Sequence, residues 1–120
     1  MKKKEPEYSC GLEASLDVVG GKWKVLILWP LHPEPRRFGE LRREVKGISE
    51  KMLIQQLREL EADGIVARKD FHEVPPRVEY SLTKLGEELR PSIDEMWKWG
   101  KIFLDGIPEH REKAEKAGKS

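Results

Sequence analysis

The apolar positions along the chain follow two different periods. Most segments repeat apolar residues every three or four positions, which is typical of helices with one buried face. Two short segments alternate apolar and polar residues instead, which is typical of strands. The pattern predicts helices over residues 10–19, 22–31, 38–45, 49–63 and 83–103, and strands over residues 65–71 and 77–82.

Capping residues, glycines and prolines mark the ends of these segments. Ser49 is a good N-cap, because its hydroxyl can accept a hydrogen bond from a free N–H of the first helical turn. Gly64 suits the end of that helix, since glycine readily adopts a left-handed conformation. Pro30 is expected to end or kink the second helix, because proline lacks an N–H and clashes with the preceding turn. Thr83 is expected to cap the last helix and Pro91 to bend it.

The same spacing predicts which side chains face the core. The helix over 49–63 carries Leu53, Leu57 and Leu60 on one stripe, so this stripe is expected to be buried. The other residues expected to point inward are Trp23, Leu26, Ile27 and Trp29 of the second helix, Phe38, Leu41 and Val45 of the third, and Val78, Tyr80 and Leu82 of the last strand.

The order of the elements predicts the fold class. A short helix, a turn at residues 46–48, a capped helix and a two-stranded hairpin follow one another, as in a helix-turn-helix with a β-wing. Lys51, Gln55 and Arg58 lie on a different face of the capped helix from the leucine stripe. These side chains can hydrogen-bond base edges and phosphates. We therefore expect a mainly α protein with a small antiparallel β-wing that reads double-stranded DNA.

Length and composition narrow the class of protein. The 120 residues predict one domain, and 38% of them are charged, which favours a water-soluble protein. The longest apolar run, residues 25–31, is too short to span a bilayer, and no signal peptide is visible. The single cysteine indicates a reducing compartment, so we expect a cytoplasmic protein. We expect a flexible basic arm over 1–8, the domain over 9–104, and a charged, frayed tail over 105–120.

The charge distribution supports DNA binding by one face. The net charge is only +1, so the chain as a whole is not basic. Lys and Arg nevertheless outnumber acidic residues between positions 36 and 58. Charge alone would favour a merely solvated face, whereas the helix and wing pattern reverses that preference. The basic residues of this segment are Arg36, Arg37, Arg42, Arg43, Lys46, Lys51 and Arg58.

Several sequence blocks follow one another at characteristic spacings. The blocks are Gly20-Gly21-Lys22-Trp23, Arg36-Arg37-Phe38, Glu40-Leu41-Arg42-Arg43, Gly47-Ile48-Ser49, Lys51-Met52-Leu53, Leu57-Arg58-Glu59-Leu60-Glu61, Asp63-Gly64 and Glu73-Val74-Pro75-Pro76-Arg77-Val78-Glu79-Tyr80-Ser81-Leu82-Thr83. Together, in this order, they resemble the HxlR family of winged-helix transcriptional regulators, from Cys10 to about Gly100. The resemblance implies a homodimer that binds operator DNA and represses or activates transcription, with most of the dimer interface formed by the first and last helices.

Two kinds of contact residue follow from the pattern and the resemblance. The last helix has more apolar surface than a small domain needs, which agrees with a dimer. The expected interface residues are Leu12, Leu16, Leu89, Ile93, Met96, Trp97 and Phe103. The expected DNA contacts are Lys22, Arg36, Arg37, Ser49, Lys51, Met52, Gln55, Arg58 and Arg77. Between Arg68 and Glu73 the sequence shows no aromatic–basic pair of the kind expected to grip a minor groove.

Cys10 is the one candidate for chemistry, and two interpretations stay open. It lies at or just before a helix N-terminus, where the helix dipole favours the reactive thiolate. The resemblance implies that some relatives use the matching cysteine to sense oxidants or electrophiles. The alternative is a small packing residue beneath a dimer interface.

The sequence predicts no enzyme and no cofactor. His32, His72 and His110 are scattered, so with one cysteine they offer no metal-ligand spacing. No Gly-rich phosphate loop or nucleophile motif is present. The preferred function is a DNA-binding regulator, most simply a repressor, with an unidentified small-molecule or oxidant effector. The alternative is a winged-helix module that binds only protein.

Overall fold

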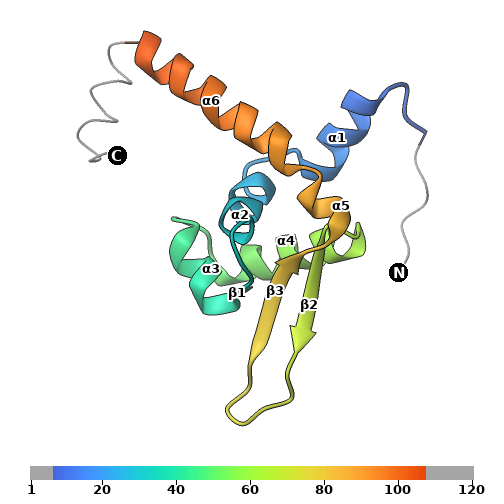
Figure 1. Ribbon diagram of the computed structural model, residues 1–120, viewed down its shortest axis with the longest axis vertical. Helices are drawn as coiled ribbons and strands as arrows, with labels where there is room; N and C mark the ends of the chain where they lie inside the picture. Colours follow the sequence, from blue (N-terminus) through green and yellow to red (C-terminus); the bar gives the residue numbers. More distant parts are fainter. Residues whose placement is uncertain (1–6, 108–120) are drawn as a thin grey trace. The chain divides into compact units, whose positions relative to one another are not determined.

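The fold contains six helices and three strands within residues 7–107, the part of the chain that this computed structural model describes. The described residues fall into two compact units, the first reaching to Glu87 and the second beginning at Glu88. The predicted arm over 1–8 and tail over 105–120 lie largely outside the described residues. The elements, shown in Figure 1, are α1 (Gly11–Val19), α2 (Lys24–Leu31), β1 (Arg36–Arg37), α3 (Phe38–Glu44), α4 (Glu50–Ala62), β2 (Val66–Asp70), β3 (Val78–Leu82), α5 (Lys84–Glu87) and α6 (Arg90–Gly106).

The predicted helix-turn-helix is confirmed as α3, a short turn and α4. The turn contains Gly47, whose φ of 89° suits a residue without a Cβ. Ser49 caps α4, because its Oγ accepts a hydrogen bond from the Met52 N–H at 3.0 Å. The leucine stripe of α4 is fully buried, together with Leu41 of α3. Burial of these apolar side chains fixes α4 against the first unit and leaves its opposite face exposed.

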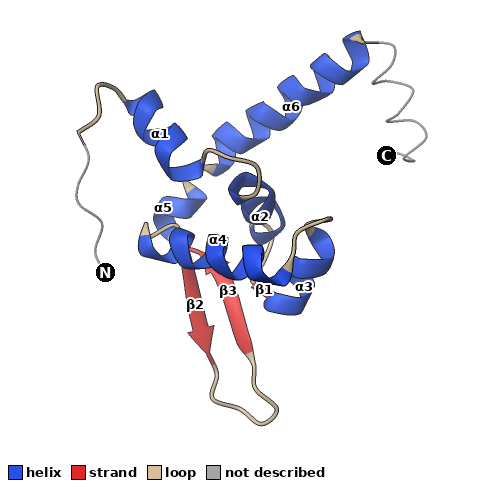
Figure 2. Cartoon of the chain, turned by 180° about the vertical axis from the view of Figure 1, so that it is seen from behind, coloured by secondary structure: helices blue, strands red, loops and turns tan. Residues whose placement is uncertain are grey.

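The wing is a three-stranded antiparallel sheet in the order β1-β3-β2. Arg68 of β2 and Arg36 of β1 both pair with Tyr80 of β3, whose side chain is buried. Figure 2 shows α2, α3 and α4 gathered at one end of the β2–β3 hairpin, whose loop projects away from them. The sequence did not predict β1, since two residues are too few to show a strand period.

The predicted inward face of α2 is partly wrong. Ile27, Leu28 and Leu31 are buried, whereas Leu26 and Trp29 are exposed. The segment is apolar on almost every side, so its pattern cannot indicate which side faces the core. Pro30 lies inside α2, and the helix ends only one residue later.

The single helix predicted over 83–103 is two helices. Thr83 caps the short α5, with its Oγ1 accepting from the Gly86 N–H at 3.1 Å and donating to the Gly64 carbonyl oxygen at 2.6 Å. The chain then starts a new helix, α6, and Pro91 lies in its first turn instead of bending it. Proline is tolerated there, because the first N–H groups of a helix have no partner within the helix. The predicted bend at Pro91 is therefore wrong.

Candidate nucleic-acid interface

The exposed side of α4 presents a mixed polar and apolar surface. Lys51, Ile54, Gln55 and Arg58, here called the outer face of α4, line a surface hollow together with acidic side chains of the same helix. The leucine stripe lies on the opposite side, so the outer face can meet a partner without disturbing the core. Three of its four members are the Lys, Gln and Arg that the sequence predicted as DNA contacts.

Ile54 is a member of this face that sequence reasoning missed. Its side chain is 36% exposed among the polar residues of the outer face. An apolar side chain in a DNA-reading surface can contact the methyl group of thymine. The available signal was that Ile54 lies outside the stripe formed by Leu53, Leu57 and Leu60.

Two predicted contact residues on α4 have local roles. The Ser49 hydroxyl is the helix cap already described. Met52 is half-buried, and its sulfur accepts from Gln56 Nε2 at 3.5 Å. Neither residue lines the hollow of the outer face. Their contribution to a partner is therefore expected to be indirect, through the start of α4.

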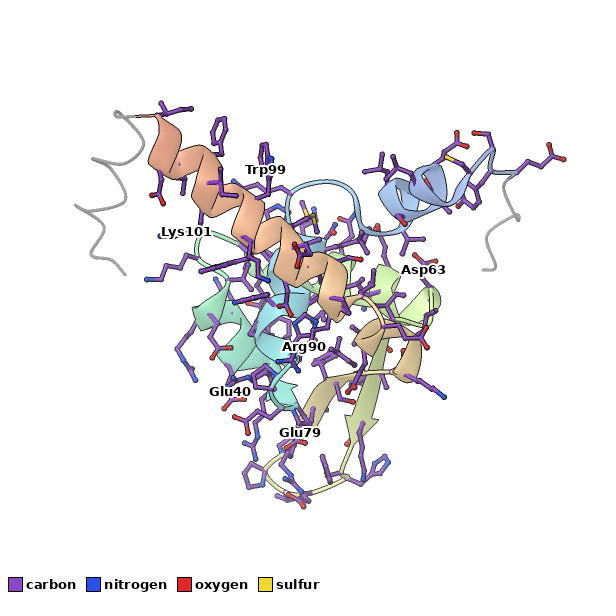
Figure 3. All side chains as sticks on the ribbon, turned by 45° about the horizontal axis from the view of Figure 1, so that its top comes forward. Glu40, Asp63, Glu79, Arg90, Trp99 and Lys101 are labelled. Atoms are coloured by element: carbon purple, nitrogen blue, oxygen red, sulfur yellow. The ribbon has the colours of Figure 1, made fainter. Side chains whose placement is uncertain are left out.

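The arginine pair before α3 divides into two roles. Arg36 Nε donates to the Pro30 carbonyl oxygen at 3.0 Å, and its guanidinium lies 3.3 Å from a Glu44 carboxylate oxygen and 3.5 Å from one of Glu34. Arg36 thus connects the end of α2 with the end of α3. Arg37 is exposed, and its backbone N–H donates to Glu40 at 2.8 Å (Glu40 is labelled in Figure 3). Arg37 is therefore the better placed of the two to meet phosphate.

Lys22 lies before α2 and is also exposed. Its Nζ lies 4.6 Å from the centroid of the Trp23 ring, a cation–π distance. This contact restrains the lysine while leaving its charge at the surface, as a phosphate contact requires.

The wing contains a cluster of aromatic and charged side chains. The Arg77 guanidinium lies 3.6 Å from the centroid of the Phe71 ring, and Lys69 Nζ lies 4.7 Å from the same ring. Arg77 also contacts Glu73 at 3.1 Å and Glu79 at 3.4 Å (Glu79 is labelled in Figure 3). The expectation that residues 68–73 hold no aromatic–basic pair is wrong, because Lys69 lies over the Phe71 ring within this segment. Arg77 adds a second contact with the same ring from the other side of the hairpin loop.

This cluster changes the interpretation of Arg77. Its charge is already matched by two carboxylates, and its side chain is largely covered. Arg77 therefore stabilises the wing, and Arg68, exposed on β2, is the wing cation that shares a second hollow with Arg58 of α4. Sequence reasoning missed Arg68, although its basic type within the first wing strand was an available signal.

The exposed thiol of Cys10 occupies the N-cap position of α1. The backbone N–H groups of Glu13 and Leu12 lower the pKa of this thiol, because they donate hydrogen bonds to the thiolate. The preceding chain is held beside α1, since Tyr8 Oη donates to Asp17 at 2.7 Å. The thiol is thus accessible, and its pKa is lowered.

Both predicted dimerisation helices carry exposed apolar side chains. On α1, Leu12 is 70% exposed and Leu16 is also exposed. On α6, Trp99 is 65% and Ile102 is 69% exposed, and Figure 3 shows Trp99 projecting from the helix. The further exposed apolar residues of α6 are Met96, Trp97 and Phe103, the last stacked on Trp99 at a centroid distance of 5.6 Å.

Two residues of the predicted interface offer less surface. Ile93 is only 3% exposed within the single chain, and Leu89 is half-buried. Little of Ile93 remains for a partner to cover. Trp99 and Ile102 are more exposed than Met96, Trp97 and Phe103 of the same helix.

Neither a metal site nor a membrane span appears in residues 7–107. Within this range no three His, Cys, Asp or Glu side chains are close enough to hold a metal ion together. None of the helices described there is both long enough and apolar enough to cross a bilayer.

Known proteins share both the sequence and the fold. The profile of the HxlR-like helix-turn-helix family matches residues 18–108. The HTH-type transcriptional regulator YkvN of Bacillus subtilis strain 168 is 50% identical over 99 residues, which cover 82% of this chain and 84% of YkvN. The redox regulator HypR in its reduced form superposes with a TM-score of 0.78 at 46% identity, covering 83% of this chain and 99% of HypR. The reduced form of the transcriptional regulator YodB from B. subtilis gives a TM-score of 0.71 at 35% identity, with coverage of 83% and 99%. The chain belongs to the HxlR-like helix-turn-helix family, and it is a transcriptional regulator of the helix-turn-helix type.

Proposed function

We propose that the protein is a cytoplasmic homodimer that binds an operator with two-fold symmetry and represses transcription. The observation that carries this proposal is the outer face of α4, where Lys51, Gln55 and Arg58 stand exposed opposite a buried leucine stripe. A recognition helix placed in the major groove uses such side chains to read base edges. Exposed Arg37, before α3, and exposed Arg68, on β2, supply further phosphate contacts.

The apolar surfaces of α1 and α6 support the homodimer. Exposed apolar side chains that gather on one element usually mark an interface, because contact with water is unfavourable for them. A dimer with two-fold symmetry would place one α4 from each subunit on the DNA. Repression then requires only that the dimer occupy promoter DNA, whereas activation requires a further surface for the polymerase.

Salt dependence tests DNA binding against the protein-binding alternative. Phosphate contacts release condensed counterions, so the logarithm of the binding constant should fall linearly with the logarithm of salt concentration. Duplex binding is measured by fluorescence anisotropy over a range of salt concentrations. A wild-type protein whose duplex affinity is negligible even at low salt would be a protein-binding module instead.

We further propose that oxidation of Cys10 regulates DNA binding. The thiol is exposed, its pKa is lowered, and the similar protein HypR is named a redox regulator. With one cysteine per chain, a disulfide must join two subunits or attach a small thiol. When diamide oxidises two thiols to a disulfide, it takes up their two electrons and two protons and becomes the hydrazine. A changed geometry at α1 would alter the separation of the two α4 helices in the dimer.

Diamide treatment tests this regulation directly. Operator affinity should change in the wild type and return when a thiol reductant is added. Cys10→Ser is the matched control, because it only exchanges the sulfur atom for oxygen and cannot form a disulfide. Equal affinity of the treated and untreated wild type would leave Cys10 as a packing residue.

A further inference from the structure

An ion pair connects α2 with α4 beside the outer face of α4. Lys24 Nζ contacts Glu59 Oε1, and the side chains of these residues are 12% and 45% exposed. Lys24 lies in the first turn of α2 and is too covered to serve as a phosphate contact. Its charge is instead matched inside the protein, which a largely covered ammonium requires. Neither Lys24 nor Glu59 is among the predicted DNA contacts.

The second oxygen of the same carboxylate contacts a residue of the outer face. Glu59 Oε2 accepts from Gln55 Nε2 at 3.3 Å, one helical turn earlier. An ionised carboxylate can only accept hydrogen bonds, so the nitrogen end of the Gln55 amide must face it. Lys24, Glu59 and Gln55 therefore form a chain of contacts from a covered ammonium to an exposed amide.

The orientation of an amide matters for reading a base. Glutamine reads adenine with two hydrogen bonds, donating from its nitrogen to N7 and accepting at its oxygen from the N6 amino group. The amide nitrogen carries two hydrogens. When one is donated to Glu59, the other remains available beside the free oxygen. A freely rotating amide would present donor and acceptor in either order.

We infer that Glu59, held by Lys24, is a positioning residue that fixes the order in which Gln55 presents its donor and acceptor, and so sharpens the base preference of the protein. This inference rests on the proposed DNA-binding function. It assigns specificity to two residues that need not touch DNA. The ion pair also matches the negative charge of Glu59, which would otherwise repel phosphates.

The first test uses the free protein and needs no DNA. In Glu59→Gln the side chain keeps its size but can offer either an N–H or a carbonyl oxygen, so it no longer fixes the Gln55 amide. The ¹⁵N order parameter of the Gln55 side-chain amide should therefore fall relative to wild type. Glu61→Gln removes the same charge from the same helix at a position outside the Lys24–Glu59–Gln55 chain, and it should leave the order parameter unchanged.

The second test measures base discrimination. The base position read by Gln55 is first identified as the one at which Gln55→Ala loses discrimination. Dissociation constants are then measured for four duplexes that carry each of the four base pairs at this position. The preference ratio is the dissociation constant for the weakest of these duplexes divided by that for the tightest. The preference ratio should fall by about tenfold in Glu59→Gln, within the discrimination expected of one bidentate contact. Lys24→Met should lower the same ratio by a smaller factor. In a Gln55→Ala background, Glu59→Gln should leave the ratio unchanged, because the residue it positions is gone.

The outcomes separate this inference from the proposed function. A wild-type protein with no base preference at any position would overturn the proposed function. The order parameter of the Gln55 amide would still show whether Glu59 restrains that amide. A wild-type preference ratio that persists in folded Glu59→Gln would overturn the inference alone. If Lys24→Met does not fold, as judged by thermal unfolding, the preference ratios of Glu59→Gln and Glu59→Asp test the inference instead. The shorter aspartate should not reach both partners, so its ratio should also fall.

Discussion

At the scale of single residues, two properties distinguish the DNA contacts we expect from the other candidates: the exposure of the side chain and the absence of an ion pair with another described residue. Gln55 and Arg58 lie on the outer face of α4, and Arg37 is exposed just before α3. Arg36 and Arg77 were equally plausible from sequence, yet both are committed to ion pairs within the protein. A basic residue type therefore predicts a phosphate contact only when no carboxylate from another element reaches it first.

Two substitutions should give different signatures. Gln55→Ala should cost about 1–3 kcal/mol at the cognate site and relax discrimination at one base position. Arg37→Ala should weaken binding to all sequences and reduce the salt slope by about one unit. Anisotropy titrations with cognate and scrambled duplexes at several salt concentrations measure both effects. Equal losses from the two variants on every duplex would mean that the outer face of α4 does not read bases.

Cys10 should react at lower pH in the folded protein than in the unfolded chain. Backbone N–H groups stabilise its thiolate and lower its pKa, and the thiolate is the nucleophile. The rate of alkylation by iodoacetamide should therefore rise through a midpoint at lower pH under native conditions than in denaturant. The sign follows because a lowered pKa means that the proton leaves earlier as pH rises. Coincident midpoints would show that α1 does not activate the thiol.

At the scale of elements, the sequence predicted the helices and strands well where their period was clear. The amphipathic α4 and its serine cap could be predicted, since one apolar stripe and one capping residue sufficed. The buried face of α2 could not be predicted, because the helix carries leucine, isoleucine and tryptophan on almost every side. The break between α5 and α6 was also missed. It depends on Thr83 and Gly86 meeting the Gly64–Ile65 backbone, a contact between segments distant in sequence.

The close approach at Gly86 gives a prediction about stability. A Cβ at this position would lie 2.3 Å from the Ile65 carbonyl oxygen, so backbone must shift. Gly86→Ala should lower the free energy of unfolding by about 1–3 kcal/mol, as overpacking typically does. Gly39→Ala is the matched control. Its Cβ would meet only an arginine side-chain nitrogen at 3.7 Å, and alanine in place of glycine favours a helix. Urea unfolding compares the variants, and a Gly86→Ala protein as stable as wild type would contradict the contact.

At the scale of the whole molecule, association should depend on the exposed apolar residues of α6. Trp99→Glu with Ile102→Glu places charges on side chains that are largely exposed in the single chain. If α6 forms the dimer interface, this variant should be monomeric and should lose operator affinity, because burial of unpaired charge is unfavourable. Light scattering at micromolar concentration measures the mass. Lys101→Glu, an exposed and charged position on the same helix, is the control for charge alone. A wild-type protein that is itself monomeric would contradict the proposed homodimer.

Selection of bound sequences from random duplex DNA tests most directly whether a symmetric pair of α4 helices reads an operator. A two-fold dimer with one recognition helix per subunit should select an inverted repeat. The centres of its half-sites should lie about one helical turn, roughly 34 Å, apart or at a multiple of that distance. Recovery of only direct repeats, or of no motif from a folded protein at low salt, would contradict DNA reading by such a dimer.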